Sequence, residues 1–100
     1  MKRDEIMGQA ASLINGDRQA VYGPAKKNHE DIAAGWSVIF GVPVTAGQVA
    51  LAMTWLKTCR AVKSPDHIDS YVDGVAYFTL AGELATERPD DNVTPFKQQA

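Results

Sequence analysis

Apolar residues recur along the chain at intervals of three and four, which is the spacing of one face of an α-helix. The pattern predicts helices over about 4–14, 25–40, 46–63 and 66–86. An Asn-Gly pair, a Gly-Val-Pro run and a Ser-Pro pair separate these segments, and such residues end helices. Thr45 is well suited to cap the third segment. We therefore predict an all-α fold, a compact bundle of about four helices in which helices three and four form a hairpin.

The last two segments each carry apolar residues on two faces. In segment 46–63, one face holds Val49, Met53 and Leu56 and is continued by Arg60, and another holds Leu51, Trp55 and Val62. Each of these helices must therefore be covered twice. Because a chain of 100 residues has few elements to supply that cover, we expect self-association into a homo-oligomer through helices three and four.

Positions on the predicted helices also indicate which side chains are buried. Segment 25–40 is expected to turn Ile32, Trp36, Ile39 and Phe40 toward the core. We interpret Trp36 and Trp55 as core residues rather than as platforms for stacking bases. Arg60 continues an apolar stripe, so we expect it to point toward packed structure. Cys59 has no base beside it in the sequence and is interpreted as a small core residue.

Length and charge narrow the classes of protein further. One hundred residues allow a single domain, which we place at 1–87, followed by a flexible polar tail at 88–100. The net charge is -2, so the chain lacks the cationic field of a protein that binds duplex nucleic acid. A single cysteine, with no apolar run typical of a signal peptide or membrane span, predicts a cytoplasmic protein without a membrane partner.

The loop before residue 25 carries the first candidate binding residues. Arg18 offers a planar cationic fork for phosphate or carboxylate, and Tyr22 offers a flat ring with a hydroxyl. Gly16 and Gly23 allow a ligand to approach the backbone closely. From the pattern alone, the favoured interpretation is a plain helix connection in which Tyr22 fills the core and Arg18 is solvated.

The second group of candidates joins the last two helices. It comprises Lys57 and Arg60 on one helix, and Asp66, Asp69, Asp73 and Tyr77 on one face of the next. Buried or half-buried charges need partners. These residues therefore either form an interhelical salt-bridge network or hold a ligand. The helix dipoles support salt bridges, because the cations lie near a helix C-terminus and the aspartates near an N-terminus.

A third group, Asn28-His29-Glu30-Asp31, opens segment 25–40. We interpret it first as capping and solvated residues. His29 and His67 are alternative ligands or hydrogen-bond donors, but a lone histidine is a weak signal.

These residues, with their spacing, resemble those of small phage proteins of unknown function. The shared pattern is Arg-x-x-x-Tyr-Gly, Asn, Trp, Leu-Lys-x-x-Arg and Asp-Ser-x-x-Asp-x-x-x-Tyr, over about residues 12–85. Its positions are Arg18, Tyr22, Gly23, Asn28, Trp36, Leu56, Lys57, Arg60, Asp69, Ser70, Asp73 and Tyr77. The pattern is similar to the nucleotide-modification-associated domain 1 family and, more distantly, to MazG-like all-α nucleotide pyrophosphohydrolases.

The resemblance implies an all-α domain of phage or prophage origin, acting in the cytoplasm of an infected bacterial host. It also implies a nucleotide-derived ligand. All the positions of the shared pattern except Gly23 and Leu56 would bind this ligand in one shared pocket. MazG-like enzymes hold magnesium with four carboxylates on two helices. Here segment 46–63 contains no Asp or Glu, and Lys57 and Arg60 lie where carboxylates would be needed.

We therefore expect a binding protein without a catalytic residue, cofactor or metal. It would sequester a cyclic nucleotide or a cyclic ADP-ribose-type host immune signal, which is an anti-defence role. The first alternative is a MazG-like metal-dependent nucleotide pyrophosphohydrolase, with magnesium at Asp66, Asp69 and Asp73. The second alternative is a module that binds a protein partner through its apolar helical faces.

Overall fold

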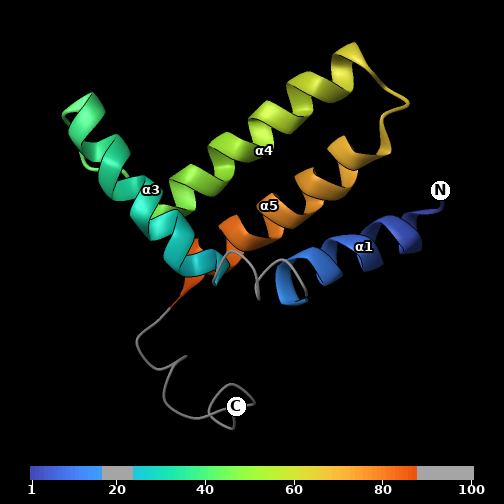
Figure 1. The fold of residues 1–100 in the computed structure, drawn as a ribbon, viewed down its shortest axis with the longest axis horizontal. Coiled ribbons are helices and arrows are strands. Elements are labelled where there is room, and N and C mark those ends of the chain that lie inside the picture. The colour runs from blue at the N-terminus through green and yellow to red at the C-terminus, as the bar shows by residue number, and fades with distance from the viewer. Residues whose placement is uncertain (17–23, 88–100) are drawn as a thin grey trace, which may run out of the picture.

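The structure, a computed structural model, describes residues 1–16 and 24–87. Over these residues the helices are α1 (Arg3–Asn15), α3 (Ala25–Phe40), α4 (Ala46–Lys63) and α5 (Ile68–Thr86). Figure 1 shows α4 and α5 side by side as a hairpin, with α1 along α5 and α3 crossing the start of α4. The predicted all-α class and the hairpin are confirmed, and each predicted helix has its counterpart in the described residues.

Local chemistry explains where the helices begin and end. The hydroxyl of Thr45 accepts a hydrogen bond from the Gln48 amide at 3.1 Å, and the Gln48 side chain accepts one from the Thr45 amide at 2.9 Å. This capping box starts α4 at the predicted place. At the end of α3, Gly41 adopts a left-handed conformation with φ 71° and donates to the Ser37 carbonyl at 3.0 Å. Residues with a Cβ rarely adopt that conformation, so Gly41 ends the helix.

Helix α5 is central, because it packs against α1 on one face and against α4 on another. Val72 and Ala76 of α5 form one buried cluster with Ala10 of α1. The second cluster joins α5 to α4 and contains Ala50, Leu80 and Ala81. Several of these side chains are small, which brings the helix axes close together.

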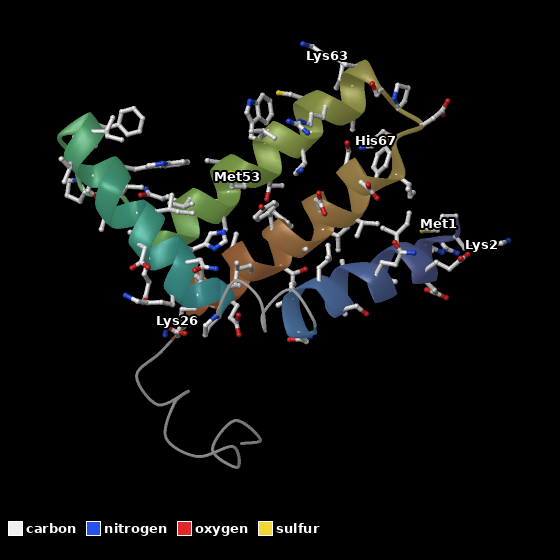
Figure 2. The ribbon with its side chains drawn as sticks, viewed as in Figure 1. Met1, Lys2, Lys26, Met53, Lys63 and His67 are labelled. Carbon is white, nitrogen blue, oxygen red and sulfur yellow. The ribbon has the colours of Figure 1, made fainter. Side chains whose placement is uncertain are left out.

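Helix α3 is tied to the rest of the fold at both of its ends. The Lys26 ammonium meets the Glu87 carboxylate, beyond the end of α5, at 2.7 Å, and Figure 2 shows Lys26 at this junction. The hydrogen bond to Glu87 raises the pKa of Lys26 above its ordinary value. The Ser37 hydroxyl accepts from the Val44 amide at 2.8 Å and donates to the Ala33 carbonyl at 2.7 Å. These bonds hold the α3–α4 loop against α3.

The buried face of α3 differs from the prediction. Its buried residues are His29 and Ala33, whereas Ile32, Ile39 and Phe40 are exposed. Figure 1 shows the reason, because the first half of α3 crosses the other helices and its last turns project beyond them. The apolar side chains on that projecting half are therefore left exposed.

Two predicted core residues of α4 also lie outside. Trp55 is 70% exposed, and Cys59 is exposed as well. The inner face of α4 is filled instead by Val49 and Ala50, which are fully buried. Small side chains occupy the contact between α4 and α5, so the large ring of Trp55 is left at the surface. None of the described helices is long and apolar enough to span a membrane.

Candidate functional site

Polar side chains line the contact between α4 and α5. Ser70, Asp73 and Tyr77 follow one another at spacings of three and four, so they share one face of α5. A Cβ built on Gly74, on the same face, would lie 3.7 Å from the Cβ of Lys57 in α4. This face of α5 is therefore turned toward Lys57.

Lys57 and Asp73 form the central contact of this face. The Lys57 Nζ lies 3.0 Å from Asp73 Oδ2, and the two side chains are 16% and 23% exposed. The Lys57–Asp73 pair is therefore shielded from water more than an exposed ion pair is, but less than a fully buried one. Of the two alternatives for these charges, an interhelical salt bridge is observed for Lys57 and Asp73.

His29 of α3 meets the same face from the other side. Its ring centroid lies 5.9 Å from that of Tyr77, with the planes tilted by 57°. His29 Nδ1 lies 2.9 Å from the carbonyl oxygen of Ala25. A carbonyl only accepts, so Nδ1 carries the proton and a neutral ring leaves Nε2 as an acceptor. We call Lys57, Ser70, Asp73, Tyr77 and His29 the polar row.

Two atoms of the polar row are buried without a hydrogen-bond partner among the described residues. They are His29 Nε2 and Ser70 Oγ, on residues that are 7% and 3% exposed. Buried polar atoms in folded proteins are almost always hydrogen-bonded, and each one left unpaired costs about 1–3 kcal/mol. An acceptor and a hydroxyl are thus available for a partner from outside these residues.

The other predicted site residues fall into three places. Trp36 is half-buried in α3 and packs edge to face on Phe40, with ring centroids 6.3 Å apart. Asn28 is half-buried beside His29. Asp69 is exposed at the start of α5, and Arg18 and Tyr22 lie outside the described residues.

The prediction that Arg60 points into packed structure is wrong. Exposure rises along its stripe, from Val49 with no exposed surface, through half-buried Met53 and 40%-exposed Leu56, to exposed Arg60. Helix α3 covers this side of α4 near its start only, and Figure 2 shows Lys63 at the end of α4 farthest from α3. The apolar periodicity of α4 is real, but α3, which covers the start of this stripe, does not extend as far as Arg60.

Sequence reasoning assigned His29 to the solvated start of a helix and so missed its place in the polar row. A signal was present, because His29 precedes Ala33 by four residues and Trp36 by seven. That spacing puts all three on one face of a helix. Tyr77, which the sequence analysis placed with the aspartates on one face of this helix, is half-buried against His29.

The aspartates of α5 are not gathered as a metal site in the described part of the chain. No group of three or more His, Cys, Asp or Glu side chains there is placed to hold a metal ion. Asp73 is engaged with Lys57, and Asp66 and Asp69 are exposed.

Comparisons with known proteins find a family whose function is not known. Residues 5–85 match a domain of unknown function, DUF6378. The chain is also 36% identical over 91 residues to the gene 55 protein of Mycobacterium phage L5. The aligned region covers 90% of this chain and 57% of that protein. The chain thus spans little more than half the length of this relative. No solved structure matches the chain, and membership of the nucleotide-modification-associated domain 1 family is not confirmed.

Proposed function

This chain belongs to the DUF6378 family of domains of unknown function, and from that premise we propose that it binds a nucleotide-derived ligand at the polar row. The observation that carries the proposal is that two buried atoms, Ser70 Oγ and His29 Nε2, have no hydrogen-bond partner among the described residues. Residues 1–16 and 24–87 therefore do not by themselves satisfy these two atoms.

The chemistry of the polar row matches the parts of a nucleotide. The Lys57 ammonium has three donors and spends one on Asp73. The other donors and the Ser70 hydroxyl suit phosphate oxygens, since hydrogen bonds to charged groups are among the stronger ones. The second carboxylate oxygen of Asp73 and the bare His29 Nε2 accept from ribose hydroxyls or base amino groups. The Tyr77 ring offers a face for a base.

We propose sequestration rather than turnover as the role. A cyclic nucleotide or a cyclic ADP-ribose-type immune signal of a bacterial host is the expected ligand class. The similarity to a phage gene product supports a phage origin, and we propose an anti-defence role for a protein of that origin. The cation of Lys57 beside Asp73 supports direct contact with phosphate, because a neighbouring ammonium weakens the hold of a carboxylate on magnesium.

Calorimetry with a panel of nucleoside triphosphates, cyclic mononucleotides and cyclic ADP-ribose, with and without magnesium, tests the proposal. We expect one ligand class to bind and to be recovered intact after denaturation. Lys57→Met should weaken binding about tenfold to a hundredfold, because it removes a charge-assisted contact of about 1.5–3 kcal/mol. Ser70→Ala should also weaken binding.

Lys27→Met is the matched control for Lys57→Met. Lys27 is also paired with an aspartate, Asp31 at 2.9 Å, but its side chain is 67% exposed on α3. This variant should bind as the unchanged protein does. Equal losses in both lysine variants would contradict a specific site. Magnesium-dependent release of pyrophosphate, lost on Asp73→Asn, would favour the pyrophosphohydrolase instead.

A protein partner is the second candidate, because large apolar side chains are exposed on the projecting half of α3. Val38, Ile39 and Phe40 are the residues concerned. Contiguous exposed apolar surface marks protein interaction sites. If no nucleotide in the panel binds, and Phe40→Glu abolishes recovery of a host protein that the unchanged chain retains, this candidate replaces the first.

A further inference from the structure

The face of α4 that points away from α5 carries an uncharged stripe. Leu51, Trp55, Thr58 and Val62 follow at spacings of four, three and four, so they lie along one side of the helix. We call these four residues the outer stripe. All of them are exposed, and the residues that flank them on this side, Gln48, Ala52 and Cys59, are also uncharged.

The side chains of the outer stripe are ordered so that two copies of the stripe, laid antiparallel, complement each other. Leu51 and Val62 lie at equal distances from the midpoint between residues 56 and 57, and so do Trp55 and Thr58. When two copies of α4 cross antiparallel at this midpoint, each Trp55 faces a Thr58 and each Leu51 faces a Val62. A large ring thus meets a small side chain twice, as a two-fold interface requires.

The polar atoms of the outer stripe are compatible with burial. The Thr58 hydroxyl donates to the Thr54 carbonyl at 3.0 Å within its own helix. Its oxygen retains a lone pair, which can accept the indole N–H of the facing Trp55. Buried indole groups usually find such a partner. Covering this stripe therefore leaves neither group unpaired.

The exposed area is large enough for a stable pair. Leu51, Trp55 and Val62 are 49%, 70% and 78% exposed, which corresponds to roughly 400 Å² of surface for side chains of this size. Figure 1 shows α3 and α4 diverging as the two arms of a V. On the α3 arm, Val38, Ile39, Phe40 and the neighbouring Val42 are exposed as well. Successive residues of a helix point about 100° apart, so only part of the α3 arm can join the outer stripe in one interface. The stripe and that part together reach roughly 600 Å², the lower end of the share of one partner in an interface of standard size.

We propose that a second copy of this chain covers the outer stripe, with the two α4 helices antiparallel and Trp55 of each packed on Thr58 of the other. The self-complementary order of the stripe selects a second copy over an unrelated partner. Lys57 lies on the opposite side of α4, against α5. The dimer therefore does not cover the polar row and does not depend on the proposed ligand.

Sedimentation equilibrium of the full chain at micromolar concentration tests the proposal. The unchanged protein should have the mass of two chains. Trp55→Glu should weaken dimerisation at least about thirtyfold, because buried tryptophans are typical hot spots of interfaces. Phe78→Glu is the control, since Phe78 is an aromatic residue of α5 that is 62% exposed, and it should leave the dimer intact. Circular dichroism checks that both variants keep their helices.

The single cysteine gives a second measurement on the unchanged sequence. In the antiparallel pair the two Cys59 Cα atoms are roughly 8–12 Å apart, from the helix rise and the usual distance between helix axes. That is too far for a disulfide but within reach of a short bismaleimide. We expect covalent dimers with this reagent and none with an oxidant alone.

Several results would overturn the proposal. One is a monomeric unchanged protein, which would leave the stripe to another partner. Another is a dimer that survives Trp55→Glu, or one that Phe78→Glu disrupts equally. A ligand that binds the monomeric Trp55→Glu variant would still support the proposed function, so the two proposals fail separately.

Discussion

Replacing Asp73 by Asn keeps the size of the side chain but leaves the half-buried Lys57 ammonium facing a neutral group. Across the 3.0 Å between Lys57 Nζ and Asp73 Oδ2, the gross attraction is about 5 kcal/mol at an effective dielectric constant of about 20. Desolvation of two side chains that are 16% and 23% exposed offsets most of it. We expect a loss in unfolding free energy of about 1–3 kcal/mol, between the values typical of exposed and buried pairs.

A double-mutant cycle isolates this pair from the other effects of each substitution. The unfolding free energy is measured in urea for the unchanged protein, Asp73→Asn, Lys57→Met and the double variant. Because the two side chains are in contact, the losses should not add, and the coupling should be about 1–2 kcal/mol. For a chain of this length, the single loss of about 1–3 kcal/mol corresponds to a melting temperature lower by about 4–24 °C, at about 4–8 °C per kcal/mol.

The exposed pair Lys27–Asp31 provides the comparison. Its side chains are 67% and 61% exposed, one helical turn apart, so its coupling should be about 0.5 kcal/mol or less and should vanish in high salt. The Lys57–Asp73 coupling should survive the same salt because water reaches it less. Equal couplings in the two pairs, or equal sensitivity to salt, would refute the claim that the polar row is electrostatically distinct from the surface.

Further predictions concern the scaffold around the site. Leu80→Ala should lower the unfolding free energy by about 2–4 kcal/mol in urea denaturation, because Leu80 is buried between α5 and α4; a loss below 1 kcal/mol would contradict that packing. Thr45→Ala should cost about 1 kcal/mol through loss of the N-cap of α4, whereas Thr45→Ser should not. The hydrogen bond to Glu87 raises the pKa of Lys26. The contribution of this bond to stability is therefore fully present below pH 10.5 and fades as the pH rises through the raised pKa of Lys26. Glu87→Gln should return the pKa of Lys26, measured by NMR, toward 10.5.

The candidate site was only partly accessible to sequence reasoning. The Lys57–Asp73 contact is one form of the salt-bridge alternative, because opposite charges lie on the two helices of the hairpin, and a spacing of four residues places Tyr77 on the same face as Asp73. His29 was not found, because the choice between a capping residue and a buried one depends on where α5 crosses α3. The contribution of Arg18 and Tyr22 stays a prediction, since both lie outside the described residues.

The helices could be located from the amino-acid sequence, because their limits depend on neighbouring residues only. The capping box at Thr45, the left-handed Gly41 and the break at Ser64-Pro65 act within one turn of chain. Predicted segments 25–40 and 46–63 accordingly coincide with α3 and α4.

Which apolar face of each helix is covered depends on how the helices pack against one another. Periodicity marks Val49 and Trp55 alike as members of apolar stripes, yet Val49 is fully buried and Trp55 is exposed. The physical reason is that burial depends on how far a neighbouring helix extends and how closely it approaches. Small residues such as Ala50 and Ala81 bring α4 and α5 together, and α3 covers only the start of α4. No spacing within a single helix contains that information.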